Sequence, residues 1–413
     1  MTEIADDIFL ARQPILDRSQ SIVAFELLFR SGQQNFAQID NELNATASVI
    51  ISLFNEMGVQ SVLGNERGFI NVSADFLMSD MLELLPTGQI VIELLETIEI
   101  TPAILARCRA LKKLGFSLAL DDFAVMQAQY KELLPIVEII KVDLMQLSKE
   151  ELIKTSRKLR EYPAKLLAEK VESREEFEHC KKLGFHFFQG YYFAKPAILT
   201  GKRAEPSTIA LFKLLSLVLE DAASEELENA IKADSNLTYN LLKLVNSVGS
   251  GAGQKIDSLG KAILVIGRRQ LQRWLQLLLY TINDKGQTSN PLMQLAATRA
   301  KMLEILCRCL NNQDTAMQER AFITGSFSLL DTLLSMPMAD VMAQLNMPIE
   351  VKLALIERTG LLGQLLKLIE SLEKGGFEAV DALLKAIPEL DSKMLNEAQM
   401  AAIRWVSSLS ETK

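Results

Sequence analysis

Seven side chains able to do chemistry follow apolar runs of the sequence, and two adjacent aspartates stand among them. The seven are Glu26, Asn71, Glu93, Asp121, Lys141, Glu169 and Gln189, with Asp122 next to Asp121. Carboxylate and amide oxygens are hard ligands that suit Mg²⁺ or Mn²⁺. Two adjacent aspartates could hold a second ion about 3.5–4 Å from the first, as in phosphoester-cleaving sites. A lysine can orient a water and a further glutamate can act as general base, so these residue types favour metal-assisted phosphodiester hydrolysis.

The apolar runs that precede these side chains are predicted to be strands. Taken alone, the run Ser117–Phe123 equally indicates a strand that ends in a polar turn. The eight predicted strands are Ile8–Ala11, Ser21–Phe29, Gly68–Val72, Gln89–Leu94, the run at Ser117, Val137–Val142, Lys165–Ala168 and Phe185–Phe188. Helix-sized connections separate most of them, including Asn41–Met57, Pro102–Leu114 and Glu176–Leu183. This alternation predicts a parallel sheet closed as a (β/α)8 barrel, whose chemistry sits at the carboxyl ends of the strands.

The composition narrows the class of protein. The chain has 413 residues, 49% of them hydrophobic, and a net charge of −8. That charge argues against electrostatic binding to a nucleic acid polymer. The acidic start lacks the apolar stretch of a signal peptide, and no run is long enough to span a membrane. The four cysteines fit no zinc or disulfide framework, and we interpret them as reduced thiols of a cytoplasmic protein: Cys108, Cys180, Cys307 and Cys309.

The second half of the chain has a different pattern. Residues 194–208 contain two prolines and three basic residues and are predicted to be a linker. Apolar stripes at helical spacing follow, and we expect helices at Ile209–Leu219, Glu225–Lys232, Ser235–Asn246 and Ser258–Ile266, with Ser258 as an N-cap. The only histidines, His179 and His186, precede this region. A histidine-dependent metal site therefore cannot form in it, and we predict a role in protein interaction or regulation.

The first half resembles EAL domains, which are TIM-barrel phosphodiesterases that linearise cyclic di-GMP. The resemblance covers residues ~5–200 and rests on short motifs in the family's order: Gln13-Pro14-Ile15, Glu26-Leu27-Leu28 with Arg30, Asn71-Val72-Ser73, Glu93-Leu94-Leu95-Glu96, Asp121-Asp122-Phe123, Lys141-Val142-Asp143, Glu169-Lys170-Val171-Glu172 and Gln189-Gly190-Tyr191. It implies hydrolysis of cyclic di-GMP to the linear dinucleotide pGpG with Mg²⁺ or Mn²⁺.

The resemblance also implies a role for each matching residue. Glu26, Asn71, Glu93 and Asp121 would bind the first metal, and Asp122 the second. Lys141 would contact the attacking water, and Glu169 would be the general base. Glu172 and Gln189 would complete the shell of ligands around the metal and the water. Glu96 would anchor the loop after Asp122, and Gln13 and Arg30 would bind the dinucleotide.

Two departures from the family pattern leave the activity open. Active members commonly have Gly-Thr-Gly after the Asp-Asp-Phe motif, where this chain has Ala124-Val125-Met126. Lys170 stands where glycine is usual. The chain is therefore predicted to be a phosphodiesterase, with a cyclic di-GMP receptor that does not hydrolyse its ligand, and a scaffold without ligand, as alternatives.

The second half resembles HDOD domains, which are all-helical relatives of HD phosphohydrolases without the catalytic residues. The similar segments include Ile231-Lys232-Ala233-Asp234, Leu241–Ser247 and Lys261-Ala262-Ile263. We therefore expect an EAL-type domain at 1–200 and an HDOD domain at 201–413 that regulates it. An unidentified protein partner is implied for the HDOD domain, and a homodimer stays open.

Overall fold

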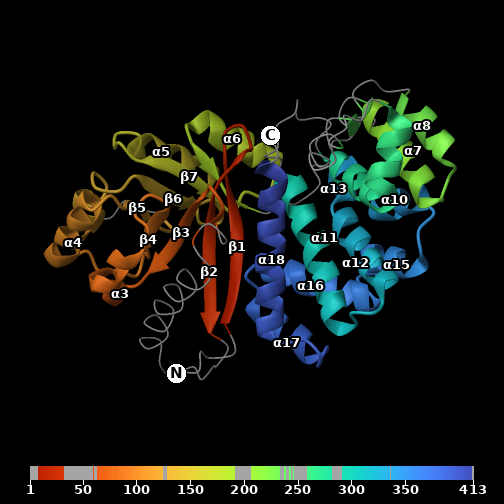
Figure 1. Ribbon diagram of the computed structural model, residues 1–413. Coiled ribbons are helices and arrows are strands. Elements are labelled where there is room, and N and C mark those ends of the chain that lie inside the picture. The colour runs from red at the N-terminus through yellow and green to blue at the C-terminus, as the bar shows by residue number, and fades with distance from the viewer. Residues whose placement is uncertain are drawn as a thin grey trace. The chain divides into compact units, whose positions relative to one another are not determined.

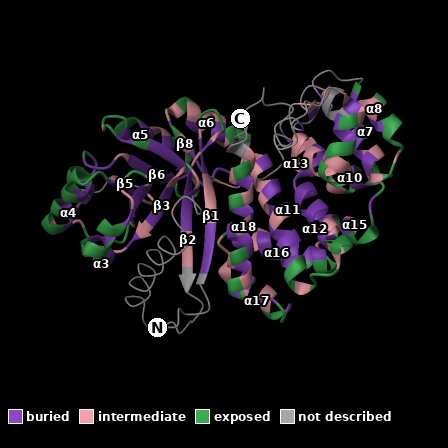
Figure 2. Ribbon diagram, viewed as in Figure 1, coloured by how far each residue is buried: buried purple, intermediate pink, exposed green. Residues whose placement is uncertain are grey.

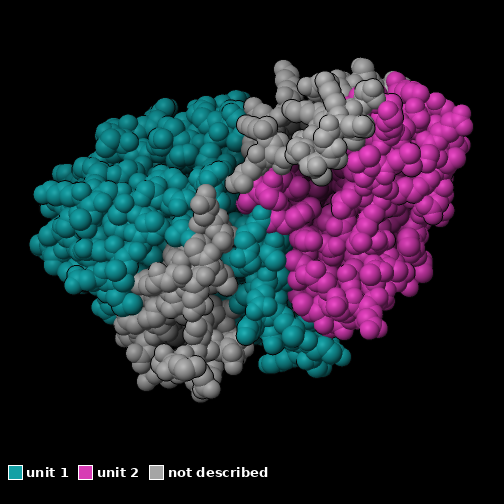
Figure 3. All heavy atoms as spheres, viewed as in Figure 1, with its two compact units in different colours: residues 1–197, 367–404 teal, residues 198–366, 405–413 magenta. Residues whose placement is uncertain are grey.

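The computed structural model describes residues 8–31, 59, 63–123, 128–190, 206–232, 237–238, 241–242, 245, 258–280, 291–334 and 336–411. The predicted helix Asn41–Met57, the segment Ala124-Val125-Met126 and most of the predicted helix Ser235–Asn246 lie outside these residues. The chain forms two compact units, coloured separately in Figure 3. Unit 1 comprises Met1–Ala197 and Lys367–Arg404, and unit 2 comprises Ile198–Leu366 and Trp405–Lys413.

Unit 1 is built on a closed barrel of eight strands in sequence order, which confirms the predicted fold (Figure 1). The strands are β1 Ile8–Asp17, β2 Ile22–Ser31, β3 Arg67–Val72, β4 Ile90–Leu94, β5 Ser117–Leu120, β6 Ile139–Asp143, β7 Lys165–Glu169 and β8 Phe187–Phe188. The helices that connect them are α3 Ala74–Met78, α4 Pro102–Lys113, α5 Lys149–Leu159 and α6 Arg174–Leu183, with 3-10 turns at Asp80–Leu84, Ala128–Glu132 and Leu144–Gln146.

The first strand corrects two predictions. β1 continues to Asp17 rather than ending at Ala11, and it runs antiparallel to both β2 and β8. The reason is the short connection, since the turn between Asp17 and Ser21 closes a hairpin and a parallel pair would need a crossover of a dozen or more residues. The remaining pairs, from β2–β3 to β7–β8, are parallel as predicted.

Local sequence signals fix the helices around the barrel. Thr101 is the N-cap of α4, and Pro102 in the first turn is a second sequence signal for the start of this helix. Ser173 and Glu176 form a capping box at the start of α6, and Gly184 ends that helix in the left-handed conformation that favours glycine. Figure 2 shows the result, with buried strands and helices whose outer faces are exposed.

The barrel interior contains a closed apolar layer. One residue from each of seven strands contributes to it, and all are buried: Ile15, Ala24, Phe69, Val91, Ala119, Ile139 and Leu167. Because side chains alternate along a strand, the residue two positions further on points to the same interior. The apolar layer therefore sets the floor on which the polar residues of the strand ends lie.

Unit 2 is helical, as predicted. Its described helices are α7 Pro206–Leu219, α8 Ser224–Lys232, α10 Leu259–Leu278, α11 Pro291–Leu310, α12 Thr315–Phe327, α13 Leu330–Leu334, α14 Met338–Ala343 and α15 Ile349–Glu357. Ser258 caps α10 as expected, and the predicted end at Ile266 is a kink at Gly267, where φ is 72°. A buried Glu304 pairs with Arg273 and with Lys301, 2.7 Å away.

One C-terminal helix and parts of two others belong to unit 1 by their contacts. The helices concerned are α16 Gly360–Glu373, α17 Phe377–Lys385 and α18 Ser392–Glu411. Met400 and Ile403 of α18 join the large apolar cluster around the barrel. The ring of Phe377 stacks on that of Phe9 in β1, with centroids 6.1 Å apart. Residues far from the barrel in sequence thus complete its apolar packing.

Candidate active site

The polar residues of the strand ends follow directly from the apolar layer of the barrel. Counting two positions on from the layer residues of β2 to β7 gives Glu26, Asn71, Glu93, Asp121, Lys141 and Glu169. In β1, which runs in the opposite direction, the equivalent residue lies two positions before Ile15, and it is Gln13. Gln13 is paired with Glu26 in the register of β1 and β2. The alternation of each strand therefore brings these side chains to one mouth of the barrel.

Lys141 lies at the centre of four of these carboxylates. Its Nζ is 2.8 Å from Asp121 Oδ1, 2.9 Å from Glu169 Oε1 and 3.5 Å from Glu26 Oε2, and it also pairs with Glu93. Only 1% of the Lys141 side chain is exposed. The ammonium thus compensates carboxylates whose side chains are at most 12% exposed.

Amides complete the cluster on the side of β2. Asn71 Nδ2 donates to Glu26 Oε1 at 3.1 Å. Gln189 Nε2 donates to Glu26 Oε2 at 2.6 Å and to Gln13 Oε1 at 2.9 Å. The NH₂ group of each amide therefore donates to a neighbouring residue, which leaves the carbonyl oxygen of the amide available as a metal ligand.

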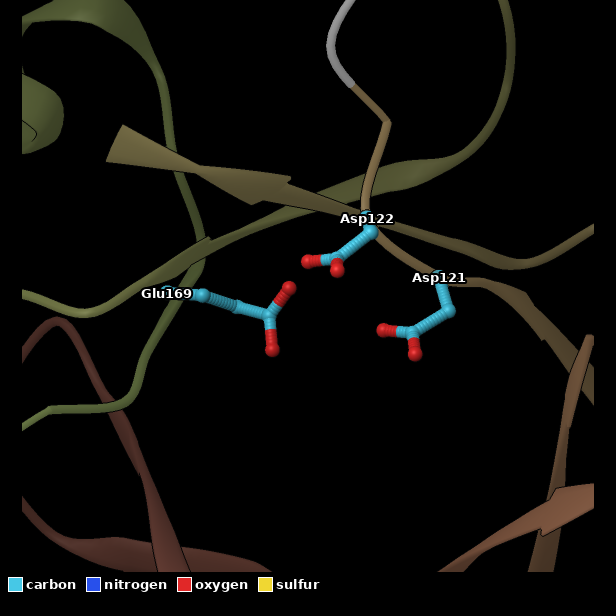
Figure 4. Close-up of side chains that lie close together, drawn as sticks. All are labelled: Asp121, Asp122 and Glu169. Atoms are coloured by element: carbon cyan, nitrogen blue, oxygen red, sulfur yellow. The ribbon is translucent and has the colours of Figure 1, made fainter. Parts of the chain in front are cut away.

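Asp122 places a further carboxylate beside Asp121 and Glu169. Asp121, Asp122 and Glu169 each offer one carboxylate oxygen, and these oxygens lie within 4.8 Å of one another. Figure 4 shows the three carboxylates directed toward a common space. The backbone of Asp122 has a φ of 42°, which turns its side chain to the same side as that of Asp121. Two consecutive carboxylates can therefore face one site despite the alternation of the strand.

Burial shapes the electrostatics of this cluster. Burial raises the pKa of Glu169 to about 8, against the opposing effect of Lys141. Burial also raises the pKa of Glu93, well above its ordinary value, and that of Asp122. Burial lowers the pKa of Lys141, but the surrounding carboxylates outweigh it and raise that pKa well above the ordinary value.

The donor set fits a divalent cation. Four buried acceptor atoms accept no hydrogen bond from any residue that the structure describes: Asn71 Oδ1, Glu93 Oε2, Glu169 Oε2 and Gln189 Oε1. Buried polar atoms normally have partners. Oxygens without donors, gathered with anionic groups, match the coordination preference of Mg²⁺ or Mn²⁺.

The turn after β7 positions Glu169 and Gln189 together. The N–H of Val171 donates to the carbonyl of Gln189 at 3.0 Å, and the N–H of Gln189 donates to the carbonyl of Ala168 at 2.8 Å. Gly190 follows, with a φ of 153°, and a Cβ there would lie 2.3 Å from both N and O of Val171. Only glycine permits this approach, which explains the Gln-Gly pair in physical terms.

Three sequence-predicted residues are exposed or only partly described. Glu172 is exposed, and its N–H donates to Glu176 in the capping box of α6. Glu96 is exposed beyond the end of β4, and the loop that it was expected to anchor lies outside the described residues. The backbone of Arg30 pairs with Phe9 in β1, but its side chain is not among those described.

One polar residue of the mouth was missed as a site residue by the sequence interpretation. Asp143 ends β6, is 1% exposed and accepts from Lys170 Nζ at 2.5 Å. The signal that could have found it is the alternation of the strand, since Asp143 lies two positions after Lys141. Its register partner in β7 is Glu169.

Within the part of the chain that the structure describes, no helix has the length and apolar character needed to cross a membrane.

Comparison with known proteins agrees with this architecture. The EAL domain model matches residues 3–196 and the HDOD domain model matches residues 208–352. The uncharacterised protein YuxH of Bacillus subtilis is 32% identical to this chain, in an alignment that covers 98% of this chain and all of YuxH. The cyclic di-GMP phosphodiesterase CdgJ of Vibrio cholerae is also 32% identical, over 97% of this chain and 93% of CdgJ.

Solved structures similar to the chain include an EAL domain protein from Listeria monocytogenes. It is 25% identical, with a TM-score of 0.37, over 46% of this chain and 88% of its own. Full-length similarity to the two relatives and the order of the two matched domains carry the assignment. The chain belongs to the family of proteins in which an EAL domain precedes an HDOD domain.

Proposed function

We propose that the barrel hydrolyses cyclic di-GMP to linear pGpG. The observation that carries the proposal is the cluster around Lys141, in which buried carboxylate and amide oxygens without donors converge at the mouth of an EAL barrel. The relative CdgJ, which is similar over nearly the whole chain, is a cyclic di-GMP phosphodiesterase. The proposal assigns the same reaction to this chain.

The proposed site uses two divalent cations, Mg²⁺ or Mn²⁺. The residues that would hold the first are Glu26, Asn71, Glu93 and Asp121, with Asp122 at the second and with Gln189 and Glu172 in the surrounding shell. The cations would neutralise phosphate charge and lower the pKa of a bound water. Gln13 and Arg30 would bind the dinucleotide, with the Arg30 guanidinium suited to a phosphate, and Glu96 would anchor the loop after Asp122.

The protein's own groups would handle the proton. Hydrolysis adds water to one phosphodiester, forms a P–O bond and breaks the P–O3′ bond, because pGpG keeps its phosphate on the 5′ oxygen. Glu169, whose Oε1 lies 2.9 Å from Lys141 Nζ, would accept the proton of the attacking water as general base. Lys141 would orient that water. The proton then passes to the departing 3′ oxygen.

A receptor that binds cyclic di-GMP without hydrolysis is the second proposal. It is favoured by Ala124-Val125-Met126, which replaces the glycines of active members. In either case we propose an EAL-type domain at residues 1–200, an HDOD domain at residues 201–413 and a cytoplasmic location. We also propose that the HDOD domain binds a protein partner. Whether the protein forms a homodimer is a question for a measurement of its oligomeric state.

One experiment separates these proposals. Purified full-length protein is incubated with cyclic di-GMP and Mg²⁺ or Mn²⁺, and bound ligand and pGpG are measured together. Product that disappears in Glu26→Ala and Glu169→Ala, but not in the matched control Glu161→Gln on the exposed loop after α5, supports the enzyme. Tight binding without product supports the receptor and overturns hydrolysis. Absence of binding overturns both.

A further inference from the structure

Lys170 follows Glu169 directly and adopts a backbone conformation that disfavours side chains. Its φ is 55°, in the left-handed region. A residue with a Cβ is disfavoured there by roughly 1 kcal/mol relative to glycine. Its side chain forms an ion pair, in which Lys170 Nζ lies 2.5 Å from Asp143 Oδ2.

Asp143 is a rigid anchor for this ammonium. Its side chain is 2% exposed. Its Oδ1 accepts from the N–H of Met145 at 2.8 Å, and its Oδ2 also accepts from Gln146 Nε2 at 3.2 Å. The strand register places Asp143 opposite Glu169. The Lys170 ammonium is thereby fixed at the mouth of the barrel, on the strand ends of β6 and β7.

The ammonium acts on the outer part of the site. Asp122 interacts electrostatically with Lys170, whereas the other charges acting on it are the negative ones of Asp121, Asp143 and Glu96. Lys170 also interacts with Glu169. By contrast, the inner carboxylates are compensated by Lys141, on the floor of the mouth.

We propose that Lys170 is a built-in counter-ion of the Asp122 carboxylate, which weakens binding of the second divalent ion at Asp122 and leaves the inner ion unaffected. This inference rests on the two-cation site of the proposed function. The Lys170 side chain is 51% exposed, so solvent weakens its repulsion of a cation at Asp122 without removing it. The second ion must bind against the positive charge of Lys170, so this residue sets the metal concentration at which the site fills. A glycine at this position offers no such charge.

The test measures Mn²⁺ binding to the metal-free full-length protein by equilibrium dialysis and by electron paramagnetic resonance, without substrate. Lys170→Met removes the charge and keeps most of the side chain. Lys170→Gly also removes the charge and suits the backbone, so it serves if the methionine variant fails to fold. Lys170→Arg keeps the charge, and Lys182→Met, on exposed residues of α6, matches the change in net charge elsewhere.

We expect the second Mn²⁺ to bind about tenfold tighter in Lys170→Met and in Lys170→Gly, with the first ion within about twofold of wild type. Lys170→Arg and Lys182→Met should bind both ions as wild type does. Unchanged or weaker second binding in both neutral variants overturns the inference, as does binding of a single ion by every variant. Failure of the proposed function is a separate result, namely Mn²⁺-loaded protein that forms no pGpG.

Discussion

Replacement of Lys141 by methionine should destabilise the metal-free barrel, because the ammonium compensates buried carboxylates. Lys141→Met keeps the apolar stem and removes a charge that lies 2.8–3.5 Å from oxygens of Asp121, Glu169 and Glu26. Coulomb energies of roughly 5 kcal/mol for each contact at an effective dielectric constant near 20 are too large for the carboxylates to stay charged. One of them must instead bind a further proton on folding.

That proton sets the magnitude of the effect. A glutamate whose ordinary pKa is 4.5 lies about 2.5 units below pH 7, and each unit corresponds to about 1.4 kcal/mol. The expected loss of unfolding free energy is therefore about 3 kcal/mol at pH 7. A carboxyl group whose folded pKa exceeds its unfolded pKa binds more protons in the folded state. The loss should consequently grow as pH rises above 4.5 and shrink as pH falls toward it.

Unfolding of the barrel can be measured separately from unfolding of unit 2, because the two units contain different probes. Cys108 and Cys180 are buried in unit 1, so their alkylation in urea reports unfolding of the barrel. Trp274 and Trp405, the two tryptophans of the chain, lie in unit 2 and report on that unit by fluorescence. In EDTA at pH 7, the alkylation midpoint of Lys141→Met should fall by about 1–2 M urea while the fluorescence midpoint stays.

Two further measurements decide the outcome. Saturating Mn²⁺ should reduce the difference between variant and wild type, since a bound cation supplies the missing positive charge. Lys182→Met is the matched control and should unfold as wild type does. Equal midpoints for Lys141→Met and wild type in EDTA at pH 8, or a loss that grows as pH falls to 5, would refute the reasoning.

Three other measurements test the packing. Glu304→Gln leaves Arg273 without its buried anion and should lower the stability of unit 2 by about 3 kcal/mol, seen in urea by tryptophan fluorescence. Burial alone would raise the pKa of Glu304, but its hydrogen bonds to Lys301 and Arg273 outweigh burial and lower that pKa. The stabilisation by Glu304 is therefore present above about pH 4.5 and should be lost as pH falls through the lowered pKa of the folded state. A difference in stability between variant and wild type that stays constant down to pH 3 would contradict this. Gly190→Ala should destabilise the barrel by about 2–4 kcal/mol, because its Cβ would lie 2.3 Å from Val171, and an unchanged alkylation midpoint would refute that. Among the four cysteines only Cys309 is exposed, so a thiol reagent should label one residue of the native protein and none in Cys309→Ser.

The alternation of the strands made much of the site predictable from sequence. A polar residue two positions after a buried apolar one, as in Val91 and Glu93 or Leu167 and Glu169, marks both the interior of the barrel and its mouth. The same alternation occurs in parallel and antiparallel strands, so it does not indicate the direction in which a strand runs. The reversal of β1 depends on the short turn before Ile22, and it changes which residue of β1 reaches the site.

Other features depend on contacts between residues distant in sequence. No local pattern indicates that Lys170 pairs with Asp143, because the pair depends on a positive φ and on the register of β6 and β7. The backbone contact of Glu172 is likewise non-obvious from the strand pattern, since its N–H donates to Glu176 in the capping box of α6. Strand alternation therefore indicates which residues gather around Lys141, whereas the contacts of Lys170 and Glu172 depend on register and on helix capping.

The C-terminal contribution to the barrel unit has a consequence for biosynthesis. Met400 and Ile403 pack into the apolar cluster of a barrel whose last strand is β8, Phe187–Phe188. At about 5–20 residues per second, a ribosome needs roughly 10–40 s to add the roughly 200 residues between them. During that interval the nascent barrel exposes apolar surface that its own distant sequence will cover. Chaperones that bind such surfaces should therefore associate with the nascent chain until α18 has been synthesised.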